Sequence, residues 1–415
     1  MGGVSMEWKE VRLGDIADVQ TGPFGSQLHK SDYIAEGIPC IMPTNIGPHL
    51  NFIVDGIAHV SEVDANRLSR HLTEIGDIIY ARRGDIEKCA YVTTNEEKWL
   101  CGTGCLKIRC NNEVNSRFIA YLLSTAECKK WITGNAVGTT MLNLSKGILS
   151  NLPLLVPSHE DQRRIASILS SLDRKIELNN KINADLEEMA QAIFKNWFVD
   201  FEPFKDGKFV DSELGMIPEG WKVGRADDFY QINIGKTPPR KEHKWFSTNP
   251  ADKIWVSIAN MGNSGIFISD SSEYLTKEAV DRHNIIMVPR NTILLSFKLT
   301  VGRVAIADKE LTTNEAIARF ILSDDKYMEY LYLYLKNFDY NSLGSTSSIA
   351  TAVNSKTIKG MQMLQPSDKI IDAFHIQVNP IFEKIRSLTK ENSRLSLLRD
   401  TLLPRLMSGE LEVPE

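Results

Sequence analysis

Apolar residues recur at helical spacing over two long stretches of the chain. Between 158 and 199, and again between 367 and 408, they lie three or four positions apart, which predicts two amphipathic helices. At about 1.5 Å per residue, each helix is roughly 60 Å long. We expect their shared face to consist of Ile165, Leu172, Ile176, Leu186, Ile193, Ile371, Phe374, Val378, Ile385, Leu388 and Leu395, extended by Leu169, Met189, Trp197, Ile381, Leu398 and Leu402.

A helix of this length leaves its apolar stripe in water unless it has a partner. The two stretches therefore favour an intramolecular antiparallel coiled coil, with two ordinary core helices as the alternative. Asn179, Asn183 and Asn392 interrupt the stripes, and buried Asn at such positions sets the register at some cost in stability. Pro404 is expected to break the second helix or to bend its last turn.

The segments before the two helices have a different pattern. Residues 1–157 and 221–366 hold short apolar runs between turns rich in Gly and Pro, which is typical of mixed α/β domains. Residues 200–220 contain two Pro and three Gly and are expected to form a linker. Residues 409–415 follow the second helix as a C-terminal tail.

The second half of the chain repeats the first about 210 residues later. Trp8-Lys9, Gly22 and Asn45-Ile46-Gly47 recur as Trp221-Lys222, Gly235 and Asn260-Met261-Gly262. A period this long indicates a duplicated domain with its helix rather than a solenoid of small units. We therefore predict an α+β protein with two globular α/β domains in a pseudo-two-fold arrangement, separated by the antiparallel helix pair.

Composition favours a globular protein without a membrane span. Of the 415 residues, 42% are apolar and 24% are charged, and the net charge is −5. No run approaches the ~18 apolar residues of a membrane helix, and the start, MGGVSMEWKE, lacks the apolar core of a secretory signal, so we expect a cytoplasmic protein. Met6 offers an alternative start. The mild acidity argues against a protein wrapped in nucleic acid, but not against one with local positive patches.

All six cysteines lie in the first half, at Cys40, Cys89, Cys101, Cys105, Cys110 and Cys128. If these cysteines formed a structural framework, a duplicated chain should carry it in both halves, and this chain does not. Three of the cysteines are closely spaced, but they form no C-x-x-C pair and no His-rich segment follows. Free cytosolic thiols are therefore favoured over a metal site.

Sequence motifs for catalysis are missing from both halves. Gly235-Lys236-Thr237 resembles the end of a phosphate-binding loop, but Tyr230 stands where that loop requires Gly, and two prolines follow. The chain has no G-x-G-x-x-G after a strand, no H-E-x-x-H, no G-x-S-x-G and no N-P-P-[YFW]. Since a duplicated enzyme should show its site twice, we predict a chain that is not catalytic by itself and holds no cofactor.

Loops rich in Gly, Ser, Thr and basic residues do recur in both halves. Cations suit phosphate contacts and small hydroxyl groups suit base edges, so their equivalent placement favours nucleic-acid contacts over ordinary solvated surface. The candidate DNA contacts are Thr21, Ser26, Lys30, Arg82, Arg83, Lys88, Thr139 and Thr140 in the first half and Lys236, Arg240, Lys241, Lys244, Lys298, Arg303, Ser345 and Ser347 in the second.

The linker and its flanks carry a more specific resemblance. The strings IFKNWF at 193–198, PFKDG at 203–207 and ELGMIPEGW at 213–221 stand beside two Trp-Lys starts and the order domain, helix, domain, helix. Over its whole length the chain resembles the specificity (S) subunit of type I restriction-modification systems. The resemblance implies two target-recognition domains, each reading one half of a bipartite DNA site in the major groove. It also implies helices that set the spacing between the half-sites.

The same resemblance implies partners and cofactors outside this chain. Two modification (methyltransferase) subunits would dock on the helices, bind S-adenosylmethionine and methylate adenine at N6 after flipping the base out of double-stranded DNA. Restriction subunits would add translocation and cleavage that depend on ATP and Mg. The alternative from another class is a coiled-coil interaction scaffold that binds proteins rather than DNA.

Overall fold

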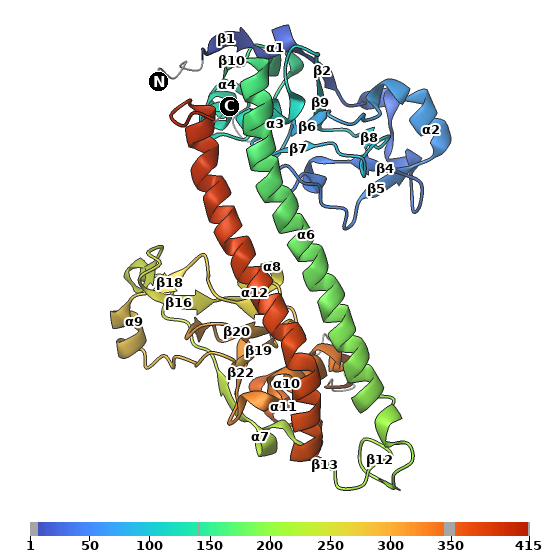
Figure 1. The fold of residues 1–415 in the computed structure, drawn as a ribbon, viewed down its shortest axis with the longest axis vertical. Coiled ribbons are helices and arrows are strands. Elements are labelled where there is room, and N and C mark those ends of the chain that lie inside the picture. The colour runs from blue at the N-terminus through green and yellow to red at the C-terminus, as the bar shows by residue number, and fades with distance from the viewer. Residues whose placement is uncertain (1–6, 139–141, 344–352, 414–415) are drawn as a thin grey trace. The chain divides into compact units, whose positions relative to one another are not determined.

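The computed structural model describes residues 7–138, 142–343 and 353–413, which form two compact units (Figure 1). Unit 1 consists of the described residues up to Glu177 and those from Ser393 onward, and unit 2 spans Leu178–Asn392. Helices α6 (His159–Phe198) and α12 (Asp368–Met407) each contribute one end to each unit. The helix bounds expected from the sequence extend one residue too far at both ends.

Unit 1 is built around a four-stranded antiparallel sheet with the order β2-β9-β6-β7. Its strands are β2 (Ala17–Thr21), β9 (Cys105–Cys110), β6 (Ile78–Ala81) and β7 (Cys89–Tyr91). A second sheet consists of β3 (Tyr33–Ile34), β5 (Ala58–Val60), β4 (Ile38–Ile41) and β8 (Leu100–Cys101). β1 (Lys9–Arg12) pairs with β10 (Pro153–Val156), the strand that leads into α6.

Short helices complete unit 1. They are α1 (Leu13–Ile16), α2 (Glu62–Arg67), α3 (Ser116–Leu123), α4 (Ala126–Asn135) and α5 (Lys146–Ser150). Asn115, Thr125 and Ser145 precede α3, α4 and α5, and each side chain accepts a hydrogen bond from a backbone N–H in the first turn. The buried Phe118 of α3 shares one core with Ile165 of α6, so the long helix is part of this core.

Unit 2 repeats this strand order. Its central sheet consists of β14 (Gln231–Ile234), β22 (Ile317–Ile321), β19 (Ile293–Ser296), β20 (Val304–Ala307) and an added β17 (Phe267–Ile268). The second sheet consists of β15 (Phe246–Ser247), β18 (Tyr274–Leu275), β16 (Lys253–Val256) and β21 (Thr312–Thr313). β13 (Lys222–Arg225) pairs with β23 (Gln362–Gln365), which leads into α12.

The other elements of unit 2 are short. They are the hairpin of β11 (Phe209–Val210) and β12 (Ile217–Pro218), and the helices α7 (Ala226–Phe229), α8 (Ile258–Asn263), α9 (Lys277–Arg282), α10 (Met328–Asn337) and α11 (Ser355–Lys359). The duplication inferred from the sequence is therefore present in the strand order of the two units. The predicted α+β class is confirmed.

In unit 2 the two long helices run antiparallel. Asn179 of α6 donates to the side-chain oxygen of Asn392 in α12 at 2.9 Å. Further along α6, Phe194 packs on Phe374 with ring centroids 6.3 Å apart. Residue numbers rise along α6 as those of the partners in α12 fall, which defines an antiparallel pair. The Asn–Asn contact agrees with the register role expected of these residues.

The same direction holds in unit 1. Asp173 of α6 pairs with Arg399 of α12 at 3.0 Å, while Ile165, earlier in α6, shares a core with Leu406, later in α12. The antiparallel helix pair predicted from the sequence is therefore confirmed within each unit. Both units also include helix residues in their domain cores, so the alternative of ordinary core helices describes part of each helix.

The predicted stripe is wrong at two positions. Met189 and Leu398 are 54% and 47% exposed, while their neighbours Ala190 and Arg399 are buried. Heptad spacing drifts by about 20° per seven residues against a straight helix, so a stripe extrapolated over two long helices leaves the contact face. Leu172, Ile176, Leu186, Ile193 and Leu395 are half-buried, and Ile165, Ile371, Phe374, Val378, Ile385 and Leu388 are buried.

α12 continues through Pro404 to Met407, so of the two outcomes expected at this proline, a break or a bent last turn, the break does not occur. Proline removes the N–H that would bond the carbonyl four residues earlier, but few hydrogen bonds follow it at the end of a helix. The Ser408 N–H donates to the Pro404 carbonyl at 3.0 Å and closes the last turn.

Candidate nucleic-acid interface

One edge of the central sheet in unit 1 gathers three loops that are distant in the sequence. Because the strands are antiparallel, β2 and β6 end at the edge where β9 begins. Loops 22–27, 82–88 and 102–104 therefore meet there, and we call them loop edge 1. The Thr103 hydroxyl donates to the Pro23 carbonyl at 2.8 Å, which ties the first loop to the third.

Two arginines dominate the charge of loop edge 1. Arg82 is half-buried and donates through Nε to the Asn143 side-chain oxygen at 3.2 Å, while Arg83 is exposed. Burial, followed by the charge of Arg83, lowers the pKa of Arg82. Among the described residues, no carboxylate lies within ion-pair distance of either guanidinium. Two neighbouring cations without a counter-ion suit a phosphate backbone.

The remaining candidates of unit 1 have different surroundings. Lys88 lies 3.3 Å from the Asp85 carboxylate in the same loop. Ser26 is exposed within loop 22–27, and Lys30 is exposed in the short turn that follows this loop. Thr21 is half-buried at the end of β2. Thr139 and Thr140 lie outside the described residues.

Unit 2 has an equivalent edge. β14 and β19 end where β22 begins, so loops 235–244, 297–303 and 313–316 meet, and we call them loop edge 2. The Lys236 N–H donates to the Thr313 carbonyl at 2.9 Å, which joins the first loop to the third.

The repeated glycine has the same structural reason at both edges. A Cβ atom on Gly22 would lie 2.1 Å from the Gly102 carbonyl oxygen, and one on Gly235 would lie 1.9 Å from the Asn314 carbonyl oxygen. No side chain fits between main-chain segments that lie so close. This part of the sequence repeat therefore preserves the contact between two loops.

One carboxylate of loop edge 2 lies beside the cations of two of its loops. The Thr237 hydroxyl donates to Glu315, which faces outward beside the cations of this edge. Partial burial would raise the pKa of Glu315, but the Thr237 hydroxyl, together with the charges of Lys298 and Arg240, lowers it overall. Loop edge 2 is therefore less positive than its count of basic residues suggests.

Two arginines of loop edge 2 are bonded to other groups of the protein. Arg240 forms a two-pronged ion pair with Glu273 at 2.8 and 3.1 Å, and its guanidinium lies 4.4 Å from the ring of Trp255. Arg303 is half-buried and donates to the Ile258 carbonyl at 2.8 Å. These bonds leave fewer donors for DNA, so the two arginines are weaker candidates than sequence position indicated.

The other candidates of unit 2 are lysines and serines. Lys236 donates to the His283 carbonyl, and Lys244 lies 3.4 Å from Glu242. Lys241 and Lys298 are exposed, and no described carboxylate lies within ion-pair distance of either. Ser345 and Ser347 lie outside the described residues.

Sequence reasoning missed a buried cation at the same position of each central sheet. The Lys107 ammonium donates to the Arg70 and Leu72 carbonyls at 2.8 Å. Arg319 donates to the Ile286 and Ile234 carbonyls at 2.9 and 2.8 Å, and burial lowers its pKa to about 10. A basic residue inside an apolar strand of both repeats was the available signal. These cations fix loops to the sheet rather than contact a ligand.

Exposed apolar residues at the loop edges were also missed. Phe24 in loop edge 1 is 59% exposed, and Leu299 in loop edge 2 is 99% exposed. Leu299 also has a positive φ of 62°, which is unfavourable for a leucine. An apolar residue between Lys298 and Thr300 was visible in the sequence, but its exposure was not.

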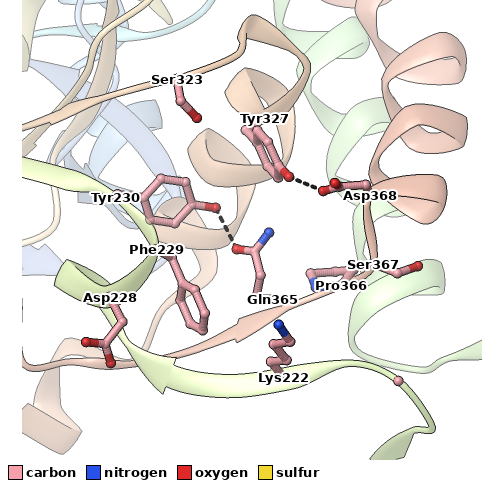
Figure 2. Close-up of a pocket in the computed structure, with 11 residues that line it drawn as sticks. Lys222, Asp228, Phe229, Tyr230, Ser323, Tyr327, Gln365, Pro366, Ser367 and Asp368 are labelled. Carbon is pink, nitrogen blue, oxygen red and sulfur yellow. Dashed lines mark hydrogen bonds between the residues drawn. The ribbon is translucent and has the colours of Figure 1, made fainter.

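A polar cleft of about 410 Å³ in unit 2 lies where β13 and β23 meet the start of α12 (Figure 2). Figure 2 shows Tyr327 pointing toward Asp368, and Tyr230 pointing toward Gln365, to which its hydroxyl donates at 3.1 Å. These hydrogen bonds are internal to the protein.

The six cysteines are free, and all but Cys110 are buried. Burial raises the pKa of Cys89 and of Cys101 to about 12, so both thiols are neutral at physiological pH. The described residues include no cluster of three metal-binding side chains. No helix among them has the length and apolarity to cross a membrane.

Comparison with known proteins identifies the recurring domain. The family model described as "Type I restriction modification DNA specificity domain" matches residues 6–188 and 218–375. The first match covers the first repeat and most of α6, and the second covers the second repeat and the start of α12. The matches favour the resemblance to specificity subunits over the interaction scaffold.

Similar proteins cover the full length of the chain. The HindI specificity subunit of Haemophilus influenzae is 28% identical and aligns with 98% of this chain and 100% of its own. The MjaIX specificity subunit of Methanocaldococcus jannaschii is 29% identical over 100% of this chain and 96% of its own. The crystal structure of an S subunit from M. genitalium has the same fold, with a TM-score of 0.60 and 15% identity over 97% of both chains.

Proposed function

The chain belongs to the type I restriction-modification specificity family and carries two of its DNA specificity domains, and from that premise we propose that its two loop edges read the two halves of a bipartite DNA site. The observation that carries the proposal is the pair of equivalent sheet edges. Both stand on the same strand order and the same constrained glycine, but they present different side chains. Cationic tips would hold phosphates, and neighbouring polar and apolar groups would contact base edges in the major groove.

The partner subunits supply the chemistry in this proposal. Two modification subunits dock on the helix pair, bind S-adenosylmethionine and methylate adenine. Restriction subunits, where the host has them, add the ATP- and Mg-dependent steps. The specificity chain itself is the non-catalytic part that determines which DNA sequence is modified and how far apart the half-sites lie.

Methylome sequencing tests the proposal. Co-expression of the chain with its modification subunit should produce a bipartite motif that is methylated on adenine. Replacing residues 1–157 with the equivalent segment of another specificity subunit should change one half of the motif only. Unmethylated DNA from a complex shown to assemble and to bind S-adenosylmethionine would contradict the proposal, and a change in both halves would contradict the division of labour.

A further inference from the structure

Leu299 is the most exposed large apolar side chain among the described residues. It is 99% exposed, whereas the next values are 77% for Val63 and 74% for Ile376. Its φ of +62° lies in the left-handed region that non-glycine residues rarely adopt. Both features are unfavourable in the free protein, and strain of this kind is typical of sites that act on a ligand.

The turn that carries Leu299 is held by hydrogen bonds. The hydroxyl of the fully buried Ser296 donates to the Thr300 carbonyl at 2.6 Å and accepts from the Arg303 N–H at 3.0 Å. The Thr300 N–H donates to the Lys298 carbonyl at 2.7 Å, across Leu299 itself. The leucine is therefore presented by a fixed turn whose two sides are both anchored.

The neighbours of Leu299 define the surface that it would meet. Lys298 precedes it with an exposed ammonium group, and Thr300 follows with an exposed hydroxyl. In DNA the ammonium suits a phosphate and the hydroxyl suits a base edge. A leucine between them needs an apolar partner, and the 5-methyl group of thymine is the apolar group that base pairs display in the major groove.

We propose that Leu299 is a specificity-determining residue that contacts the 5-methyl group of a thymine in the half-site read by unit 2. This inference rests on the proposed function. In unit 1 the equivalent loop, 82–88, has Ile86 as its one large apolar residue, and Ile86 is buried. The contact is therefore expected in one half-site and not in the other.

Uracil substitution tests the contact, because uracil pairs like thymine and lacks only the methyl group. The probes are duplexes of the methylated motif in which each thymine is replaced in turn by uracil, bound to the assembled specificity–modification complex. We expect one replacement, in the unit 2 half-site, to weaken binding about fourfold, the factor that corresponds to ~0.8 kcal/mol for one buried methyl group. Leu299→Ala should weaken binding to the thymine duplex by a similar factor and should no longer distinguish uracil from thymine.

Val63→Ala, at an exposed apolar residue of α2, is the matched control and should leave discrimination unchanged. Leu299→Asn tolerates the left-handed backbone and separates loss of the apolar contact from a change in the turn. The inference is overturned if the wild-type complex binds its motif and no uracil replacement weakens that binding. It is also overturned if the half-site read by unit 2 contains no thymine. Neither outcome affects the proposed function. In duplexes that carry the fluorescent base 2-aminopurine, increased fluorescence without a uracil effect also overturns the inference. That result indicates that Leu299 inserts between base pairs instead of contacting a methyl group. Absence of any sequence-specific binding would instead overturn the proposed function.

Discussion

Loop edge 1 and loop edge 2 stand on equivalent strands of the two central sheets and differ in how their charged side chains are arranged. In loop edge 1, Arg82 and Arg83 are neighbours without a described carboxylate at ion-pair distance. In loop edge 2, Glu315 lies close enough to Lys298 and Arg240 for their charges to lower its pKa. The sheet determines where the loops lie, and the side chains at their tips differ. This combination suits two domains that recognise unlike half-sites through a common framework.

Disrupting the shared framework should have the largest effect. In Gly235→Ala the new Cβ would lie 1.9 Å from the Asn314 carbonyl oxygen, so the backbone of loop edge 2 must move. We expect a loss of about 3 kcal/mol in the free energy of unfolding of unit 2. The half-site read by unit 2 should also be lost from the methylome while the other half is kept.

Gly134→Ala is the control for this change, because nothing lies within 4 Å of a Cβ at that position in α4. It should be neutral or stabilising in thermal unfolding. Gly22→Ala should mirror Gly235→Ala and remove the other half-site. Full recognition of both halves by Gly235→Ala would contradict the view that the loop contact positions the reading residues.

Acid should lower the stability of unit 1 through a buried histidine that lies beside a cation of its central sheet. His71 is buried beside Lys107, and burial, followed by the charges of Arg70 and Lys107, lowers its pKa from 6.5 to about 4. Since the folded pKa lies below the unfolded value, the stability is complete above pH 6.5 and is lost as the pH falls toward 4. At pH 5 we expect unit 1 to lose about 2 kcal/mol.

Hydrogen exchange of the intact chain at pH 7 and pH 5, corrected for intrinsic rates, measures this loss unit by unit. The strands β4 and β5 of unit 1 should lose protection through the His71 effect, and a His71→Gln variant should remove that part of the pH dependence. In unit 2 Arg319 stands at the position of Lys107, and its bonds are to the Ile286 and Ile234 carbonyls rather than to a histidine side chain. An identical acid response of wild type and His71→Gln would show that His71 is not the titrating group.

Local patterns were sufficient to predict the helices and the repeat. The two long helices begin and end within one residue of their expected bounds, because periodicity and the residues at helix ends are local signals. Met189 and Leu398 were placed wrongly because their burial depends on how a nearly straight helix packs on its neighbours. Tertiary packing, rather than spacing, decides which side of such a stripe is buried.

The candidate site was predictable only as a set of loops. The sequence indicated that loops after β2 and β6 carry cations, but their meeting at one sheet edge depends on strand order. The bonds of Arg240 to Glu273 and of Arg303 to Ile258 join residues more than thirty positions apart. No local pattern identifies such partners, so a basic residue in a loop could not be distinguished from one that is already paired.

Removing single cations at the two edges should have a smaller effect than the changes above. Arg83→Ala should weaken DNA binding by the assembled complex about tenfold and reduce the slope of log Kd against log salt by about one, since one phosphate contact is lost. Lys298→Ala should have a weaker effect, because Glu315 already offsets part of its charge. Lys309→Ala, at an exposed residue beyond the opposite end of β20, is the control and should change neither quantity. Equal effects of the three variants would show that the loop edges do not differ from the rest of the surface in their contact with DNA.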